Sequence, residues 1–173
     1  MGKRSLSART LFETASLGAP ENAIGFVLWR LVHRYQRELE RELASVNLTH
    51  LQFQTLALCA WLSQSSELVT QSQLARAGDI QPMQVSYMLK ALEDKGFVAR
   101  RAHSSDPRAK RVAPTAAGLR VLRQAFPLAI EVQRRLFGSD GVPGGSLHST
   151  LLQLLQDEQP SVGAGRAIAR VSR

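Results

Sequence analysis

Residues 97–118 read FVARRAHSSDPRAKRVAPTAAG, and this stretch decides the fold. Its two segments FVARR and KRVAP alternate as strands do and are flanked by turn residues. Between them, HSSDPRA is rich in Ser, Asp and Pro, which favour turns, so the stretch predicts a β-hairpin with a basic tip. A helical segment, Gln81–Lys95, precedes the hairpin and ends at Gly96. A helix followed by a basic hairpin is the pattern of a winged helix, which reads DNA through the major groove and the neighbouring backbone or minor groove.

Positive charge gathers in the same stretch. The chain has 22 Lys and Arg against 14 Asp and Glu, a formal net charge of +8. Residues 98–120 hold six basic side chains and one acidic side chain, which makes +5 of that excess. Such a footprint suits phosphate contacts, because neutralising phosphates releases condensed counterions. A solvated strand face would explain basic charge alone, but its place on a hairpin beside a helix-turn-helix favours DNA binding.

The composition is that of an ordinary globular domain. The chain has 173 residues, of which 44% are hydrophobic, and this suits one domain with a sizeable core. No apolar run approaches the roughly 20 residues that span a membrane, and the basic start MGKRSLSART is not followed by an apolar signal segment. The single cysteine, Cys59, excludes an intramolecular disulfide. These features predict a cytoplasmic protein in a reducing compartment.

The sequence contains no pattern typical of an enzyme. Its four histidines show no metal-ligand spacing with the lone cysteine or with paired carboxylates. It also lacks a glycine-rich loop that would cradle phosphates. We therefore expect neither catalysis, nor a metal, nor a cofactor.

Helices are predicted on the N-terminal side of the hairpin. Residues 1–20 have weak periodicity and are interpreted as a flexible arm with one helical turn near Leu11. Apolar residues at helical spacing predict a long helix over Glu21–Val46. A second helix begins at a Thr49 cap and extends to Leu62. This second helix is apolar nearly all round, so we expect it to be buried.

The remaining helices follow from caps and breakers. Thr70 is expected to cap a short helix over Gln71–Ala77, and Thr115 to cap a longer one over Ala116–Phe137. Pro127 is expected to kink or interrupt the longer helix. The last predicted segments are a loop at 138–145, a short helix over Leu147–Gln156 and a flexible tail at 157–173.

In this order the elements resemble the MarR family of bacterial transcription regulators. The similarity covers about Glu21–Gln156 through four segments: IGFVLWRLVHRYQREL, NLTHLQFQTLALCAWL, QSQLARAGDIQPMQVSYMLKALEDKGFVARR and DPRAKRVAPTAAG. The most specific pieces are the LEDKGFVARR turn and the wing exit D-x-R-A-K-x-V-x-x-T-x-x-G. One departure is Pro114, where the family usually has Leu. Proline removes a ladder donor, so we expect the second wing strand to stop early.

The resemblance implies a mainly α fold with a small β-hairpin wing: a winged helix-turn-helix at 49–114 and a helical dimerisation region at 21–48 and 115–156. It implies a homodimeric repressor on double-stranded DNA with a palindromic operator. It also implies a small-molecule effector that releases DNA, an aromatic acid, its thioester or a phenolic. Apolar surface on the dimerisation helices, more than one small domain can bury, also favours a dimer.

DNA contacts are expected from the outward face of the Gln81–Lys95 helix and from the wing. Glutamine pairs bidentately with adenine, and Ser or Lys contacts bases or phosphate. Arg108 matches the family's wing-tip arginine, which favours a narrow minor groove, and Asp106 matches the carboxylate that orients it. The predicted DNA-binding residues are Gln71, Ser72, Gln81, Gln84, Ser86, Tyr87, Lys90, Arg100, Asp106, Arg108 and Lys110.

An effector pocket is expected beside the first long helix. Phe26, Trp29 and His33 lie at i, i+3 and i+7 and form a second apolar stripe, and with Phe53 they provide apolar walls. Arg30 is a candidate for neutralising a ligand carboxylate. A plain core or dimer-interface role for the aromatic residues, and a solvated surface role for Arg30, are the alternatives.

Two other functions remain as alternatives. The first is a redox switch at Cys59. Some MarR relatives sense peroxides through a cysteine on the first helix, but Cys59 is on the second helix, and its apolar neighbours disfavour a reactive thiolate. The second is a winged-helix module that binds protein instead of DNA. The +5 charge near the hairpin speaks against it, because a protein-binding wing gains nothing from that charge.

Overall fold

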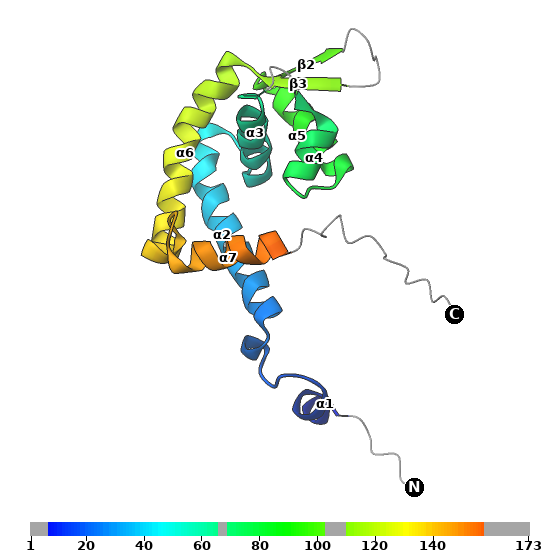
Figure 1. Cartoon of the computed structure of the whole chain (residues 1–173), viewed down its shortest axis with the longest axis vertical. Helices are drawn as coiled ribbons and strands as arrows, with labels where there is room; N and C mark the ends of the chain where they lie inside the picture. Colours follow the sequence, from blue (N-terminus) through cyan, green and yellow to red (C-terminus); the bar gives the residue numbers. More distant parts are fainter. Residues whose placement is uncertain (1–6, 66–68, 103–109, 158–173) are drawn as a thin grey trace, which may run out of the picture. The chain divides into compact units, whose positions relative to one another are not determined.

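The computed structural model describes residues 7–65, 69–102 and 110–157, and they form a mainly helical chain with one small sheet (Figure 1). The chain divides after Val132 into two compact units. Within the described residues, no helix combines the length and apolarity needed to cross a membrane. These same residues contain no group of three or more His, Cys, Asp or Glu side chains that would hold a metal ion.

The first unit begins with two helices. In α1, Ala8–Ala15, the Ser7 side chain caps the N-terminus, so the predicted arm contains a longer helical segment than the expected single turn. The long helix α2, Ile24–Leu43, lies between two short 3₁₀ helices, η1 (Pro20–Asn22) and η2 (Ala44–Val46). Its buried residues lie near its C-terminal end. The N-terminal half of α2 therefore leaves most of its apolar side chains exposed.

The third helix, α3, spans His50–Leu62 and begins at the predicted Thr49 cap. The Thr49 side chain accepts from the Gln52 backbone N–H, and Gln52 reciprocates, which makes a capping box. The prediction that α3 is buried on all sides is wrong at its end, where Trp61 is 68% exposed. Two open cavities border Trp61, so among the described residues none covers this side chain completely.

A helix-turn-helix follows. Its first helix, α4 (Gln71–Ala77), has the predicted Thr70 capping box, and its second, α5 (Pro82–Asp94), begins at Gln81. The turn between them passes through Asp79 in the left-handed region, with φ 47°. The buried residues of α5 form a stripe that packs on α3, α4 and β2.

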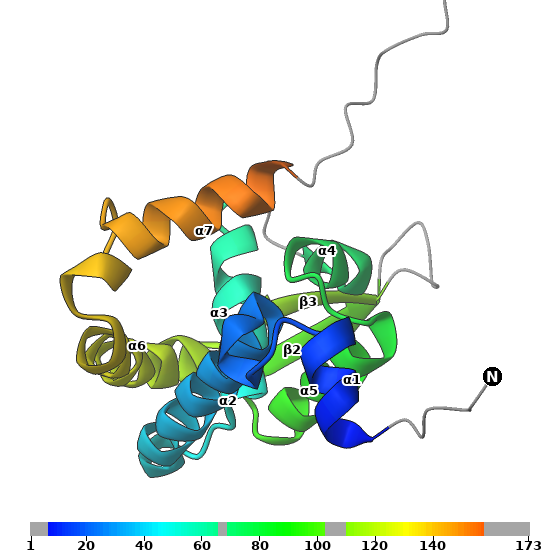
Figure 2. The same ribbon diagram turned by 90° about the horizontal axis from the view of Figure 1, so that it is seen from below.

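The sheet has three antiparallel strands in the order β1-β3-β2: β1 (Val69–Thr70), β2 (Val98–Ala102) and β3 (Lys110–Pro114). Figure 2 shows β2 alongside α5, whereas β3 contacts α3 and α4. The predicted hairpin is therefore present, and β1, for which no strand was predicted, adds a third strand. The predicted early stop at Pro114 is wrong, since Pro114 pairs with Val98 at the very end of β3. There a missing donor costs little, and the next N–H, of Thr115, donates to the Phe97 carbonyl (2.9 Å).

The helix after the wing, α6 (Ala116–Phe137), begins at the predicted Thr115 cap, whose hydroxyl accepts from the Gly118 N–H (3.0 Å). Gly118 is buried, and a Cβ there would collide with the Phe97 backbone carbonyl oxygen. The predicted interruption at Pro127 does not occur, because α6 continues through it. The close contact at Gly118 fixes the start of α6 against the beginning of the wing.

The second unit contains the end of α6, the 3₁₀ helix η3 (Gly138–Gly141) and α7 (Ser146–Asp157). Gln133 Nε2 donates to the Gly141 carbonyl (2.6 Å), which closes the loop back onto α6. The α7 leucines at 151, 152, 154 and 155 are all exposed. An exposed apolar helix face of this kind is typical of an interaction surface.

Candidate nucleic-acid interface and ligand cavity

The helix α5 presents one polar face and buries the other. Its buried Val85, Leu89 and Leu92 anchor it to the core. Among the predicted DNA contacts on this helix, Gln81, Tyr87 and Lys90 are exposed, whereas Gln84 and Ser86 are half-buried. All of them nevertheless lie on or beside a helix that follows a helix-turn-helix turn, the position that enters the major groove.

The two predicted contacts at the start of α4 differ. Ser72 is exposed, but Gln71 is engaged within the motif, where its Nε2 donates to the Pro82 carbonyl (2.8 Å). This hydrogen bond joins the first turn of α4 to the first turn of α5. The Gln71 side chain therefore sets the angle of the helix-turn-helix rather than projecting freely.

The wing, β2 and β3 with the segment between them, carries the other predicted contacts. Arg100 on β2 does not project outward. Its Nε lies 3.0 Å from Glu93 Oε2, and its Nη2 donates to the Ser86 carbonyl (3.4 Å), with only 19% of the side chain exposed. Lys110 is placed at the start of β3 by its backbone, and Asp106 and Arg108 lie outside the described residues.

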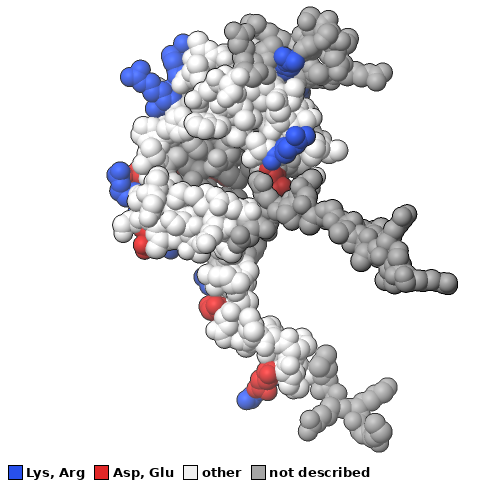
Figure 3. All heavy atoms as spheres, viewed as in Figure 1, with Lys and Arg blue, Asp and Glu red and all other residues white. Residues whose placement is uncertain are grey.

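The acidic side chains of α5 lie only at its C-terminal end, and both are paired. Residues 81–92 contain one charged side chain, Lys90, and no Asp or Glu. The two carboxylates at the end of α5 are both paired, Glu93 with Arg100 and Asp94 with Lys90. On the face shown in Figure 3, the Lys and Arg side chains of the described residues lie at separate places rather than in one continuous patch. The expected basic footprint thus depends on the wing tip as well.

A second anchor at the end of α5 was missed by sequence reasoning. Lys95 Nζ donates to the Asn47 carbonyl (2.7 Å) and to Gln52 Oε1 (2.8 Å), and it lies 3.3 Å from Asn47 Oδ1. Asn47 has a left-handed backbone (φ 55°), which directs the η2–α3 turn toward Lys95. The lysine therefore holds the end of α5 against the start of α3. The LEDKG turn marks the end of α5 in the sequence, but it does not indicate that Lys95 bonds to Asn47 and Gln52.

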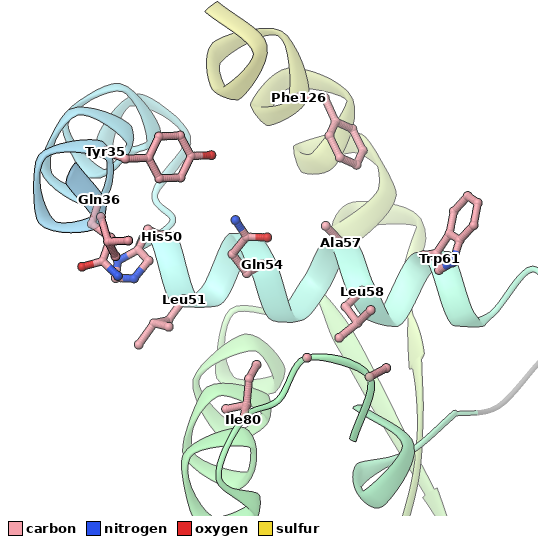
Figure 4. A pocket seen from close by; sticks show the side chains of 13 residues that line it. Tyr35, Gln36, His50, Leu51, Gln54, Ala57, Leu58, Trp61, Ile80 and Phe126 are labelled. Carbon is pink, nitrogen blue, oxygen red and sulfur yellow. The ribbon is translucent and has the colours of Figure 1, made fainter. Parts of the chain in front are cut away.

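The principal cavity lies where α2, α3, α6 and the α4–α5 turn meet, and its volume is about 640 Å³ (Figure 4). Figure 4 shows Tyr35 and Gln36 on α2, a row of side chains along α3, Phe126 on α6 and Ile80 on the turn. Most of the wall is apolar. The polar groups in the wall are Tyr35, Gln36, His50 and Gln54.

The chemistry of this cavity suits an uncharged, largely apolar body with a few hydrogen-bonding substituents. Burial raises the pKa of Tyr35 above its ordinary value, so its phenol stays neutral and can donate. His50 Nδ1 lies 3.5 Å from Glu40 Oε2. Among the described residues that line the cavity there is no Lys or Arg.

The five residues predicted for the effector do not line this cavity. Phe26 and Arg30 border a smaller hollow of about 330 Å³ on α2, where the Arg30 guanidinium lies 5.8 Å from the Phe26 ring. Trp29 and His33 are exposed and have ring centroids 4.7 Å apart. Phe53 is buried against Phe126 instead.

The predicted grouping is therefore corrected: the aromatic stripe lies on the exposed N-terminal half of α2, whereas α2 meets α3 through its C-terminal half. Helical spacing identified residues that share a face of α2, but it does not tell how far along that face the next helix packs.

A helix-turn-helix followed by a β-hairpin that is fixed to the second helix defines a winged helix-turn-helix protein. Comparisons with known proteins agree. A sequence model of the MarR family matches residues 48–110. An uncharacterised HTH-type transcriptional regulator of Bacillus subtilis (strain 168), YdcH, is 30% identical over 144 residues, which are 83% of this chain and 97% of that protein. The chain belongs to the MarR family of transcriptional regulators, which are DNA-binding proteins and not enzymes.

Solved structures have the same fold. CouR from Rhodococcus jostii RHA1, bound to p-coumaroyl-CoA, is 25% identical with a TM-score of 0.70, and the match covers 84% of this chain and 98% of CouR. A mutant MarR from E. coli, complexed with operator DNA, is 22% identical with a TM-score of 0.64, over 79% of this chain and 94% of that one. The mainly α architecture with a small wing is thereby confirmed.

Proposed function

We propose that this regulator is a homodimeric repressor that binds a palindromic operator and is released by a small aromatic or phenolic effector. The observation that carries the proposal is the position of the 640 Å³ cavity. Its wall includes Ala77, Gly78 and Ile80 of the turn that leads into α5, as well as residues of α2, α3 and α6. An occupant would therefore touch the turn that precedes the recognition helix and the long helices together.

The DNA side of the proposal rests on α5 and the wing. Exposed Gln81, Tyr87 and Lys90 supply base and phosphate contacts, and Ser72 supplies a phosphate contact from α4. We assign Gln71 and Arg100 to positioning, because both side chains are already bonded inside the motif. We also propose DNA contacts from Asp106, Arg108 and Lys110, on the basis of the sequence alone.

The effector side rests on the size and lining of the cavity. A volume of about 640 Å³ lies within the range of small-molecule sites. An aromatic ring would pack against Leu58, Trp61 and Phe126, and its polar end would meet Gln54 and His50. That CouR binds p-coumaroyl-CoA supports an aromatic thioester, whose acyl part is uncharged, as the first class to test. The ligand would release DNA only by preferring one spacing of the recognition helices over another.

Exposed apolar helix faces support the dimer. The N-terminal half of α2 exposes Ile24, Val27 and Leu28, and α7 exposes four leucines. Monomeric proteins rarely leave large apolar patches in water. Pairing two copies through the proposed dimerisation region, residues 21–48 and 115–156, would cover them and give the two-fold symmetry that a palindrome matches.

A thermal-shift screen of aromatic acids, their thioesters and phenolics tests the effector proposal. We expect a ligand of this class to raise the melting temperature of the wild-type protein, since binding to the folded state stabilises it. Ala57→Phe, which fills the cavity wall, should abolish the shift, while Trp29→Ala, outside the cavity, should retain it. A shift that Trp29→Ala abolishes and Ala57→Phe preserves would place the effector on α2 instead.

The Cys59 alternative loses support. Cys59 has no exposed surface, and burial raises the pKa of its thiol to about 11. A redox sensor needs an accessible thiolate.

A further inference from the structure

The recognition helix α5 exposes two large side chains that a water-facing helix has no reason to carry. Met83 is 69% exposed and Tyr87 is 65% exposed. They are four residues apart, so they are neighbours on one face of α5. The buried stripe of Val85, Leu89 and Leu92 points elsewhere, into the core. Met83 and Tyr87 thus form a projecting apolar pair at the N-terminal half of the helix.

The start of α5 is held firmly in place beneath this pair. Pro82 occupies the first turn, and its carbonyl accepts from Gln71 Nε2 of α4 (2.8 Å). Because the backbone next to Met83 is fixed, its side chain is presented at a defined position rather than on a mobile end. The N-terminal residues of a recognition helix are also those that meet base edges.

The surroundings of the pair suit DNA. Gln81 and Gln84 flank it with amide groups, and the only charge between residues 81 and 92 is the positive one on Lys90. Among the four bases, only thymine presents a methyl group in the major groove, and apolar side chains recognise it. The flexible thioether of Met83 adapts to such a group, and the Tyr87 ring provides a rigid wall beside it.

We propose that Met83, supported by Tyr87, reads the C5-methyl group of a thymine in each half-site of the operator. The proposal rests on the operator binding proposed above. It assigns to this chain a specificity-determining residue and a required base. It also explains why an apolar side chain stands exposed between two glutamines.

The test removes only the methyl group. A duplex is first selected from a random pool by the full-length wild-type protein, and each thymine is then replaced in turn by deoxyuridine. We expect one symmetry-related thymine position at which the replacement weakens binding about fourfold per half-site, as the loss of one buried methyl group implies. In Met83→Ala the same replacement should have no effect, and Met83→Leu, which keeps an apolar contact, should restore it.

Three results would overturn the inference. The first is a thymine-to-deoxyuridine effect of equal size in wild type and Met83→Ala, and the second is no effect at any thymine. The third is a Met83→Ala protein that keeps the effect but changes its oligomeric mass, because Met83 would then contact a second copy of the chain. Failure to select any duplex would instead contradict the operator proposal itself, and the inference would fall with it.

Discussion

Glu93 Oε2 lies 3.0 Å from Arg100 Nε, so an ion pair joins the last turn of the recognition helix to the first strand of the wing. The contact is an ion pair rather than an aligned hydrogen bond. Arg100 also donates to the carbonyl of Ser86, which lies about two turns earlier in α5. Because the arginine is largely shielded from water, this pair is stronger than an exposed one. It fixes the angle between the two elements that we propose contact DNA.

Glu93→Ala should weaken operator binding about tenfold, roughly 1.4 kcal/mol, although it removes a negative charge close to DNA. The physical reason is that the wing loses its fixed angle to α5. Asp94→Ala is the matched control, because it breaks the exposed Lys90–Asp94 pair on the same turn and should leave affinity unchanged or slightly raised. Equilibrium titrations at constant salt compare the two. If both variants bound operator DNA more tightly than the wild type, and to the same extent, Glu93 would act only through its charge.

Arg108→Ala should weaken binding and lower the slope of log affinity against log salt by about one unit or less. Arg108 lies outside the described residues, so this prediction rests on its place at the wing tip in the sequence. The fold should be retained, since a wing tip buries little. Titrations at several salt concentrations measure the slope, and an unchanged affinity with an unchanged slope would refute the assignment.

Gly118→Ala should destabilise the protein by at least about 2 kcal/mol, because the new methyl group meets the Phe97 backbone carbonyl and the backbone cannot yield cheaply. Gly25→Ala is the control. Gly25 is helical with open space around its Cβ position, so the same substitution there should stabilise by about 0.5–1 kcal/mol. Denaturant unfolding compares them, and a neutral Gly118→Ala would contradict the described contact between α6 and the wing.

The buried thiol of Cys59 predicts a pH dependence of stability. Its pKa is raised from 9.0 to about 11 because burial disfavours the thiolate. Between these values the unfolded chain has released the proton and the folded chain has not. The free energy of unfolding therefore falls as pH rises from about 9 to about 11, and it is unaffected by this group at lower pH.

Cys59→Ala isolates that effect from other groups that titrate in the same range. This substitution should lower the free energy of unfolding by about 1 kcal/mol at neutral pH, because packing contacts are lost. The stability difference between wild type and variant should then shrink above about pH 9. A difference that stays constant up to about pH 11 would mean that the thiol is accessible to water.

The sequence predicted local features well because their causes are local. The caps at Thr49, Thr70 and Thr115 follow from a hydroxyl beside the first free backbone N–H groups, and all three are present. The hairpin followed from alternation and turn residues. By contrast, the sequence did not predict β1, since two residues carry no pattern and become a strand only by pairing with Arg111 and Val112.

The candidate site was harder to predict because its parts meet only in three dimensions. The cavity needs α2, α3, α6 and the α4–α5 turn together, and the predicted stripe on α2 contributes no residue to its wall. The bonds of Lys95 join residues 48 and 43 positions apart. No local rule identifies such a pair. The sequence shows that Arg100 is basic, but only the structure shows that Arg100 pairs with Glu93 and so positions the wing.

Footprinting on a duplex selected by the protein would show whether two winged helix-turn-helix units bind one palindromic operator. We predict two protected half-sites related by a two-fold axis, with centres about one helical turn, roughly 10 bp, apart. A single isolated half-site, protected without symmetry, would contradict it.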